Sequence, residues 1–538
     1  MGSLPDLTER ARPLDPRPAA RTISDPHRHR AVLTQIPVST IYRKEWPWRK
    51  PRVPARAPVF GAINRRRDSA ASSVGAASVR RLITRQPPKV PKAIVRRFTI
   101  LCIASGLCAT ALLPFTAFAG AEAGAVPLAI MHTAAAVVAP FSPFILQKAG
   151  PRVIVTVAHV LVCVLLSAHT VATPLTVLLF LYAICGVTLS PMSLALTVSA
   201  TSLAQAAGDE CRRKIALRRA LRGLRASQDL GLVLGSLLLG GALMIWPEDV
   251  TPLQATTAAT NVTVTGWPPP EEFYIEDDYE ERTCGAAGCP QIRMLSGGAG
   301  LSGSGRSALT AAWAGLALAG AALAAAGASA AAAPPDSRAS KRDPRATLAA
   351  PMGLFIGLQQ GFIYTSYIKW YGVCVGGWVG AWRALCGAGA LQALAAATLS
   401  MAAARAGSAG GAGGRGVAGR AFAAGGGAAH ASLLLALLRW RAARSDLALP
   451  AVAAAAWGAC AALWDVLQSS ICVGGPGWRG PWSLTLASRH AGLALACVAR
   501  RLLCVKAQLA GLALSLAAAL ASHIALEFRQ RRTEARRS

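Results

Sequence analysis

The sequence predicts an all-α transmembrane protein with about twelve spanning helices. Of its 538 residues, 53% are apolar and only 15% are charged, a balance unusual for a soluble chain of this length. The apolar residues gather in runs of roughly twenty, enough to cross about 30 Å of hydrocarbon as a helix. Lys and Arg lie mostly outside these runs, and 22 of the 56 fall in residues 1–97.

The apolar runs give two sets of six helices. The first run, 98–118, carries no charged residue. The remaining predicted helices lie near 125–146, 153–172, 175–204, 228–246, 307–333, 348–370, 377–404, 416–439, 447–470, 483–500 and 504–527.

Five parts follow from this pattern. The N-terminal tail is rich in Pro, Arg and Ser, lacks a helical or strand period, and buries too little apolar surface to offset its chain entropy, so we expect it to be disordered. The predicted parts are the basic cytoplasmic tail 1–97, a first bundle 98–333 with a polar loop 247–305, a basic cytoplasmic linker 334–347, a second bundle 348–527, and a basic cytoplasmic tail 528–538.

The distribution of basic residues predicts the topology of the first half. Loop 247–305 holds two arginines among nine acidic residues. An excess of Lys and Arg marks the cytoplasmic side, so this loop should face the lumen or the exterior and both termini should be cytoplasmic. The membrane is the plasma membrane or an endomembrane. The basic residues that define the cytoplasmic side are Lys148, Arg152, Arg212, Arg213, Lys214, Arg218, Arg219, Arg222, Arg225, Arg338, Lys341, Arg342 and Arg345.

The second half departs from this rule. Two basic clusters fall on the non-cytoplasmic side: Arg439, Arg441 and Arg444, and Arg500, Arg501 and Lys506. Either some helix boundaries here are wrong, or the region is unusually diverged or imperfectly translated from its gene.

Composition and motifs exclude several function classes. The net charge of +31 does not indicate nucleic-acid binding, because the charge lies in the tail and in short loops and no nucleic-acid-binding module is legible. No nucleophile elbow, zinc-protease motif, phosphate loop or metal-ligand spacing occurs. We therefore expect no enzyme activity, no cofactor and no bound metal, with the lipid bilayer as the first partner.

The polar loop carries two predicted modifications. Asn261 begins an Asn-Val-Thr sequon, which is a glycosylation acceptor on the non-cytoplasmic side. Cys284 and Cys289 flank a Gly- and Ala-rich stretch that can close a tight ring, so we expect a disulfide between them. The alternative, two free thiols, requires a reducing compartment.

Three polar residues in predicted helices need partners. Gln359 and Gln360 are adjacent amides that point to neighbouring faces of a helix, either as helix–helix contacts or as part of a substrate site. Asp465 is protonated, lies in a water-filled pathway, or is paired, with Arg489 as a candidate partner. Asp229 is similar but is expected near the cytoplasmic end of its helix.

Two helices and the cysteine loop resemble a known family. The segment 357–362 reads GLQQGF and is followed by Tyr364, Tyr367 and the Val373-Cys374 pair. The segment 457–469 contains Trp-Gly, then Asp465 and Gln468. With the Cys-Gly-x-x-x-Cys loop, these motifs resemble the uncoordinated-93 family of the major facilitator superfamily.

The resemblance implies a fold of two six-helix bundles and a protein that partners other membrane proteins. Members of the family are regarded as regulators of potassium channels or as escorts of receptors. The alternative is a proton-coupled secondary transporter that uses Asp465, Gln359 and Gln360. A transporter should bring charged groups from both halves to the midplane, whereas the first half offers only Glu122 and three histidines, so the sequence favours the regulator.

The sequon gives a direct test of topology. Glycosidase treatment should increase the gel mobility of the wild-type protein from glycosylating cells and leave Asn261→Gln unchanged, because a used sequon must face the lumen. A wild-type protein without a shift would count against the predicted placement of the loop.

Overall fold

The computed structural model describes ten stretches of the chain: residues 90–121, 124–171, 173–208, 210–247, 284–290, 301–327, 344–409, 411–443, 445–473 and 477–535. These stretches are helical apart from turns and one isolated bridge between Pro247 and Leu301. The first-half helices are α2 (Lys92–Ala121), α3 (Val126–Val138), η2 (Ala139–Phe141), α4 (Ser142–Ala168), α5 (Leu175–Gln205), α6 (Glu210–Ile245), η3 (Gly285–Ala287) and α8 (Gly303–Gly327).

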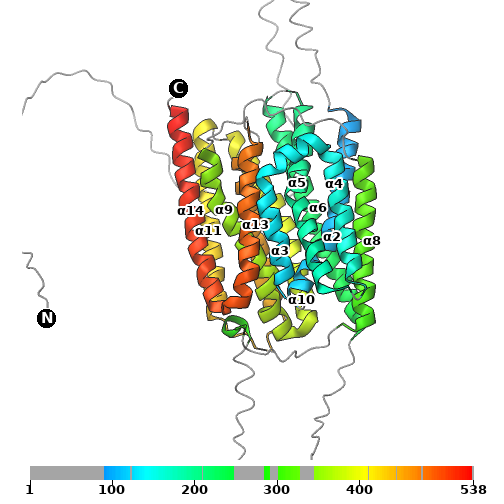
Figure 1. Ribbon diagram of the computed structural model, residues 1–538. Helices are drawn as coiled ribbons and strands as arrows, with labels where there is room; N and C mark the ends of the chain where they lie inside the picture. The colour runs from blue at the N-terminus through cyan, green and yellow to red at the C-terminus, as the bar shows by residue number, and fades with distance from the viewer. Residues whose placement is uncertain are drawn as a thin grey trace, which may run out of the picture. The chain divides into compact units, whose positions relative to one another are not determined.

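The second half is built in the same way (Figure 1). Its first spanning helix continues into a π-helical stretch, η4. The elements are α9 (Pro344–Phe362), η4 (Ile363–Val373), α10 (Cys374–Ala409), α11 (Gly411–Arg439), α12 (Leu449–Cys472), α13 (Arg479–Leu502) and α14 (Val505–Ala535).

Among the described residues, nine segments are long and apolar enough to cross a membrane. Two of them are too long for one crossing. The segment Val126–Ala168 has 43 residues, about twice the hydrocarbon thickness as a straight helix, and turns at Gly150, whose φ is 76°. The segment Thr347–Ala402 has 56 residues and turns at Gly377, whose φ is 61°. With each of these two segments counted as two passes and α13 added, the described part of the chain makes twelve passes.

The passes, numbered in chain order, pack as two equivalent sets. In the first half, α2 contacts α6 and α8, α3 contacts α5, and α4 contacts α5 and α8. In pass numbers these are 1 with 5, 1 with 6, 2 with 4, 3 with 4 and 3 with 6. Adding six to each number gives contacts that the second half also makes. The most extensive contacts between the halves join α3 to α13 and α6 to α10. These are passes 2 with 11 and 5 with 8. If each pass is replaced by its equivalent in the other half, the first contact becomes the second.

This equivalence identifies the two six-helix bundles as structural repeats. Six is an even number, so both repeats begin on the same side and are related by an axis along the membrane normal. That is the arrangement of the major facilitator fold. The predicted fold class, an all-α transmembrane protein with two six-helix bundles, is confirmed.

Close packing inside each repeat depends on glycine at matching places. Gly186 of α5 lies against the carbonyl of Met131 in α3, and a Cβ would overlap it. Gly458 of α12 lies against the carbonyl of Ala388 in α10 in the same way. These are passes 2 with 4 and 8 with 10, so the same backbone-to-backbone approach occurs in both halves. Small residues at such contacts let membrane helices pack closely.

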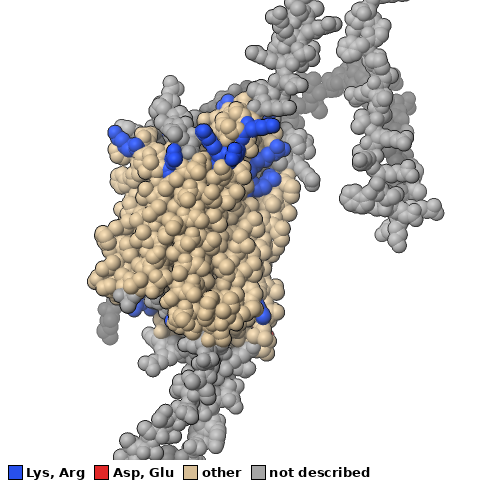
Figure 2. All heavy atoms as spheres, turned by 90° about the vertical axis from the view of Figure 1, so that its right-hand side faces the viewer, with Lys and Arg blue, Asp and Glu red and all other residues tan. Residues whose placement is uncertain are grey.

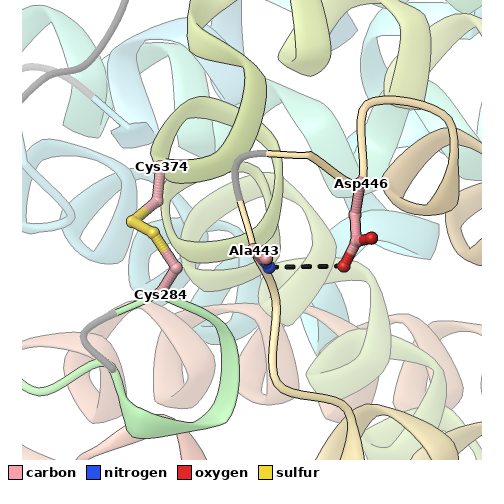
Figure 3. Close-up of a disulfide and its surroundings, with 4 residues drawn as sticks. All are labelled: Cys284, Cys374, Ala443 and Asp446. Atoms are coloured by element: carbon pink, nitrogen blue, oxygen red, sulfur yellow. Dashed lines mark hydrogen bonds between the residues drawn. A yellow bond between two sulfur atoms is a disulfide. The ribbon is translucent and has the colours of Figure 1, made fainter. Parts of the chain in front are cut away.

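One end of the helical body is closed by disulfides, and we call it the cysteine end. The η3 segment lies between Trp370, Tyr371 and Ala442. Cys284 is bonded to Cys374, at the junction of η4 and α10 (Figure 3), and Cys289 to Cys504, just before α14.

The predicted bond between Cys284 and Cys289 is therefore wrong. Both residues are oxidised, but the short helical turn between them directs each to a cysteine of the second half. The two bonds close sequence separations of 90 and 215 residues. On the loop-closure model each would contribute about 5 kcal/mol to stability, more than the six-residue ring from Cys284 to Cys289 would.

The opposite end, where α2 begins and α14 ends, we call the basic end (Figure 1). Figure 2 shows Lys and Arg gathered mainly at the upper rim of one face, with an uncharged belt below them. Exposed apolar side chains such as Val164, Phe180 and Leu318 belong to helices of the first half. In a membrane they contact lipid rather than water.

The disulfide pairing can be tested by alkylation. Cys374→Ser should leave the Cys284 thiol open to an alkylating reagent while Cys289 stays protected, because the two bonds are separate. Peptide mapping without reductant measures both. The free cysteine Cys386 gives a matched control, since Cys386→Ser should leave all four bonded cysteines protected. A cross-linked peptide joining Cys284 to Cys289 would contradict the pairing.

Candidate functional site

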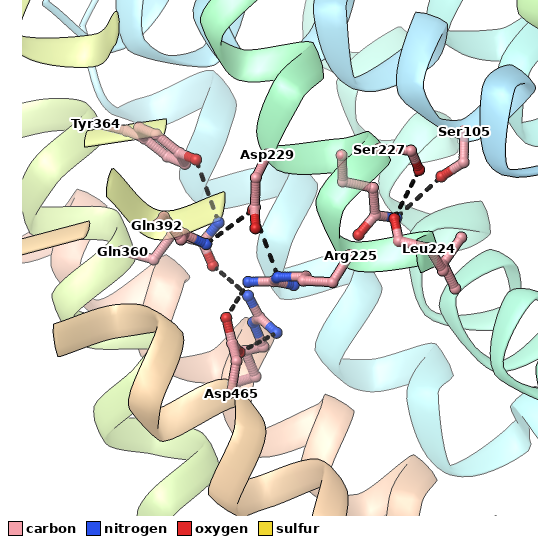
Figure 4. A network of polar contacts seen from close by, with 11 residues as sticks. Ser105, Leu224, Arg225, Ser227, Asp229, Gln360, Tyr364, Gln392 and Asp465 are labelled. Carbon is pink, nitrogen blue, oxygen red and sulfur yellow. Dashed lines mark hydrogen bonds and ion pairs between the residues drawn. The ribbon is translucent and has the colours of Figure 1, made fainter. Parts of the chain in front are cut away.

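A cluster of four charged side chains lies inside the helical body and joins its two halves. We call Arg225, Asp229, Asp465 and Arg489 the central ion cluster (Figure 4). Arg225 and Asp229 lie one turn apart on α6, in the first half. Asp465 belongs to α12 and Arg489 to α13, in the second half.

Asp465 connects the halves because it accepts from two arginines. Its Oδ2 forms an ion pair with Arg225 Nη2, across the boundary between halves. Its Oδ1 lies 3.2 Å from Arg489 Nη1. The Asp465 side chain is 12% exposed and that of Arg489 15%, so these charges are largely withdrawn from solvent. A charged group at this depth is costly unless paired, and here the pairing is mutual.

Asp229 forms the second link. Its Oδ1 lies 3.6 Å from Arg225 Nε and accepts a hydrogen bond of 3.0 Å from Gln392 Nε2 on α10. The other carboxylate oxygen, Oδ2, is buried and has no hydrogen-bond partner among the described residues. The first half therefore contacts both α10 and α12 of the second half through α6.

Polar side chains of α9 and η4 extend the cluster. Arg489 Nη2 donates to Gln360 Oε1 at 2.7 Å, and Gln360 Nε2 donates to the Tyr364 hydroxyl at 3.4 Å. Gln228 Nε2 donates to Ser105 Oγ at 3.0 Å, which ties α6 to α2 (Figure 4). The cluster, Gln360, Gln392 and Tyr364 form one connected network that reaches helices of both repeats, and the bond from Gln228 to Ser105 lies beside it.

The predicted site residues divide into two groups. The structure brings together Gln360, Tyr364, Asp465 and Arg489, and Asp465 is paired with Arg489, one of the three arrangements that the sequence left open. The other residues do not join the network.

Gln359 points elsewhere, and its buried amide oxygen has no partner among the described residues. The Tyr367 hydroxyl donates to the carbonyl of Pro450, which is a packing contact between η4 and α12. Gln468 lies one turn from Asp465 and lines a cavity described below. Asn261 and Glu122 lie outside the described residues.

The contribution of the first half is not apparent from the sequence. Arg225 was assigned to a cytoplasmic loop and Asp229 to a helix end, because the helix was expected to begin near residue 228. It begins at Glu210, which places both side chains within the body. The signal was present as an Arg and an Asp four residues apart, a helical ion-pair spacing.

A cavity of about 890 Å³ leads from the basic end toward the cluster. Residues of α5, α6, α10, α12 and α13 line it, including Arg225, Asp465 and Arg489. A smaller cavity of about 170 Å³ continues past Arg225 and Arg489 to His132 and His490. Those two imidazoles are stacked with ring centroids 5.5 Å apart, one on α3 and one on α13.

The two halves are in contact between the cluster and the cysteine end. Phe118 of α2 packs against Trp378 of α10 with ring centroids 4.8 Å apart. A Cβ on Gly120 would lie 2.7 Å from the carbonyl oxygen of Tyr364, so the two halves meet closely there. Arg500 Nη2 donates to the carbonyl of Ala121 at 3.0 Å. The cavity at the cluster leads toward the basic end, and on the side of the cysteine end the described parts of the two halves are in contact.

The described residues contain no group of three or more His, Cys, Asp or Glu that could hold a metal ion. What the arrangement offers chemically is a carboxylate shared between two guanidinium groups. A proton or an anionic ligand could change which partner each group keeps.

Comparison with known proteins adds a likeness of fold to solved structures. No protein-family model matches the chain, and no curated protein matches its sequence. The solved structures that it resembles include the nucleoside transporter NupG, at 8% sequence identity and a TM-score of 0.49, covering 81% of this chain and 99% of that chain. The assignment of the fold made above rests on the helix pairing and not on this likeness.

The shared carboxylate predicts energetic coupling. Arg489→Gln and Asp465→Asn should each destabilise the protein, because each leaves an opposite charge without its partner. The double variant should lose less than the sum, with a coupling of about 1–3 kcal/mol in a double-mutant cycle measured by equilibrium unfolding in mixed micelles. Losses that add to within about 0.5 kcal/mol would show that the pair carries no coupling.

Proposed function

We propose that this chain is a secondary transporter of the major facilitator type that moves a small solute by alternating access. The observation that carries the proposal is the central ion cluster, placed at the inner end of a cavity that leads, among the described residues, toward the basic end. Secondary transporters bind substrate and coupling ions near the midplane between their two repeats. The geometry matches a conformation that is open toward the basic end.

The cluster supplies a means of coupling. Asp465 holds Arg225 of the first half and Arg489 of the second half. Neutralising or displacing that carboxylate removes the attraction between α6 and α12, and the halves are then freer to move. A charge left unpaired inside the body would favour the conformation that gives it water or a ligand. Substrate or proton binding would in this way bias the two access states.

This proposal reverses the preference drawn from the sequence. The regulator was favoured because the first half offered few intramembrane charges. Arg225 and Asp229 supply those charges, and they contact second-half residues directly. The criterion set for a transporter, charged groups converging from both halves, is met by the described residues.

The second candidate is a regulator or escort of a channel or receptor, of the uncoordinated-93 type. The observation that favours it is at the cysteine end, where two disulfides fix a loop of the first half onto helices of the second half. Such a fixed surface suits a stable contact with another membrane protein. In either case the basic end faces the cytoplasm, which follows from its Lys and Arg content.

Transport is tested in proteoliposomes with an imposed proton gradient and a panel of labelled organic acids, amino acids, sugars and nucleosides. The wild type should accumulate at least one class above protein-free vesicles. Asp465→Asn should reduce that uptake at least about tenfold, because it removes the charge shared between the halves.

Asp446→Asn provides the matched control. Asp446 lies in the turn after α11, where its carboxylate accepts from Trp440 Nε1 at 3.1 Å and from the amide of Ala443 at 3.3 Å (Figure 3). Asparagine keeps an acceptor there, so uptake should be nearly unchanged. Absence of uptake for every class, together with co-precipitation of a channel or receptor that Asp465→Asn leaves intact, would favour the regulator.

A further inference from the structure

We propose that the cavity at the basic end binds a small anion through a carboxylate or phosphate group, with Arg218 and Arg222 as its principal charged contacts. This inference deepens the proposed function by naming the chemical class of the substrate. It rests on the arrangement of side chains around the cavity, which is basic, short of carboxylates and rich in unused donors.

The basic residues form a stripe on one face of α6. Lys214, Arg218, Arg222 and Arg225 follow one another at spacings of four, four and three residues, and all four line the cavity. Residues at these spacings share a helix face. Lys214 and Arg218 are exposed, whereas Arg222 and Arg225 are partly buried. The stripe therefore places positive charges that attract an anion along the cavity, from its mouth to the central ion cluster.

The carboxylates that line the cavity already form ion pairs with basic side chains. Glu210 Oε1 lies 2.7 Å from Lys214 Nζ, and this hydrogen bond holds the pKa of the Glu210 carboxyl below its usual value, so the pair stays neutral overall. Asp465 is shared between Arg225 and Arg489.

No other acidic residue of the described chain lines this cavity, and Arg218 and Arg222 have no carboxylate within ion-pair distance there. Their positive charges are left without a carboxylate partner, as is that of Arg213, which also lines the cavity and donates to the carbonyl of Gly208.

The uncharged polar groups point to the same kind of ligand. Gln468 is 2% exposed, lines the cavity, and its Nε2 has no hydrogen-bond partner among the described residues. Trp482 and Arg222 also line the cavity, and Trp482 Nε1 and Arg222 Nε have no hydrogen-bond partner among the described residues. Every unpartnered buried side-chain atom recorded on residues of this cavity is a donor, so the deficit is one of acceptors. Carboxylate and phosphate oxygens are acceptors that carry the required charge.

The volume and the apolar lining set limits on the ligand. About 890 Å³ lies within the range of small-molecule sites. Leu217, Leu221 and Leu486 form part of the wall, which suits a carbon skeleton attached to the anionic group. Two sources fit this chemistry: a soluble organic anion, and the headgroup of an anionic lipid.

The ordinary explanation of the stripe is the excess of basic residues on the cytoplasmic side, which needs no ligand. Arg219 separates the two explanations. It is an exposed arginine on the same helix, adjacent to Arg218, and it does not line the cavity. A general electrostatic effect would treat Arg219 and Arg222 alike, whereas a site would not.

The first experiment uses the purified full chain in a neutral detergent, titrated with inorganic phosphate, succinate or glycerol while its thermal unfolding is followed. Phosphate or succinate should raise the unfolding temperature in a saturable manner, and glycerol should not at the same concentrations. Arg222→Gln should raise the half-saturating concentration about tenfold or more, and Arg219→Gln should change it less than about twofold, because only the former removes a charged contact.

Further variants keep the result interpretable if Arg222→Gln folds poorly. Arg222→Lys keeps the charge and should restore most of the affinity, and Arg218→Gln, at the exposed mouth, should weaken binding without harming the fold. Equal losses in Arg219→Gln and Arg222→Gln would overturn the site, because they would reveal a general electrostatic effect.

A second arm distinguishes the two sources. The protein is placed in nanodiscs of phosphatidylcholine alone or with phosphatidic acid added. Stabilisation by phosphatidic acid that is lost in Arg222→Gln, with no effect of soluble phosphate or succinate, identifies a lipid headgroup. Stabilisation by soluble anions in phosphatidylcholine alone identifies a soluble ligand.

No stabilisation in either arm would refute the anion site. Transport of an uncharged solute with no anion binding would leave the transporter standing, and anion binding without uptake would leave the site standing and refute the transporter.

Discussion

The structure depends on the rule that a charge inside a membrane protein must have a partner or water. Asp465 meets it with two guanidinium groups at once, Arg225 from the first half and Arg489 from the second. The same bonds that make these charges tolerable also hold α6, α12 and α13 at fixed positions. The boundary between the repeats is thus polar where most helix contacts are apolar, and the attraction across it can be altered by a proton or an anion. Contacts between closely packed apolar side chains cannot be altered by a proton or an anion in this way.

The two ends of the body have complementary roles. At the cysteine end the halves meet through the Phe118–Trp378 ring contact, the close approach at Gly120, and two disulfides. At the basic end helices of the two halves line an open cavity. A body that is closed at one end and open at the other has the asymmetry that alternating access requires. The disulfides anchor the η3 segment, which belongs to the first half, to the second half.

Much of this architecture could be predicted from the sequence, because hydrocarbon thickness fixes helix length and therefore helix number. The sequence also named Arg489 as a candidate partner of Asp465, one of three arrangements that it left open for this acid. The place of Arg225 could not be predicted, because a basic residue after an apolar run reads as the end of a helix. Here α6 runs on from Glu210, and the cavity supplies the solvation that a loop would have given. The partners of Cys284 and Cys289 were equally inaccessible, because they depend on which helix ends meet in space.

The basic clusters of the second half, which conflicted with the charge rule, have a partial physical account. Both follow helices that end at the cysteine end, the end at which the η3 segment also lies. Arg500 is 8% exposed and donates to the carbonyl of Ala121, which ends α2. Its charge serves the contact between halves and is not a free topological signal. Arg439 and Arg441 are exposed, and the structure offers no comparable account of them. A count of Lys and Arg that treats all arginines alike therefore gives the wrong topological signal at a helix end where one arginine, such as Arg500, is buried in a contact between the halves.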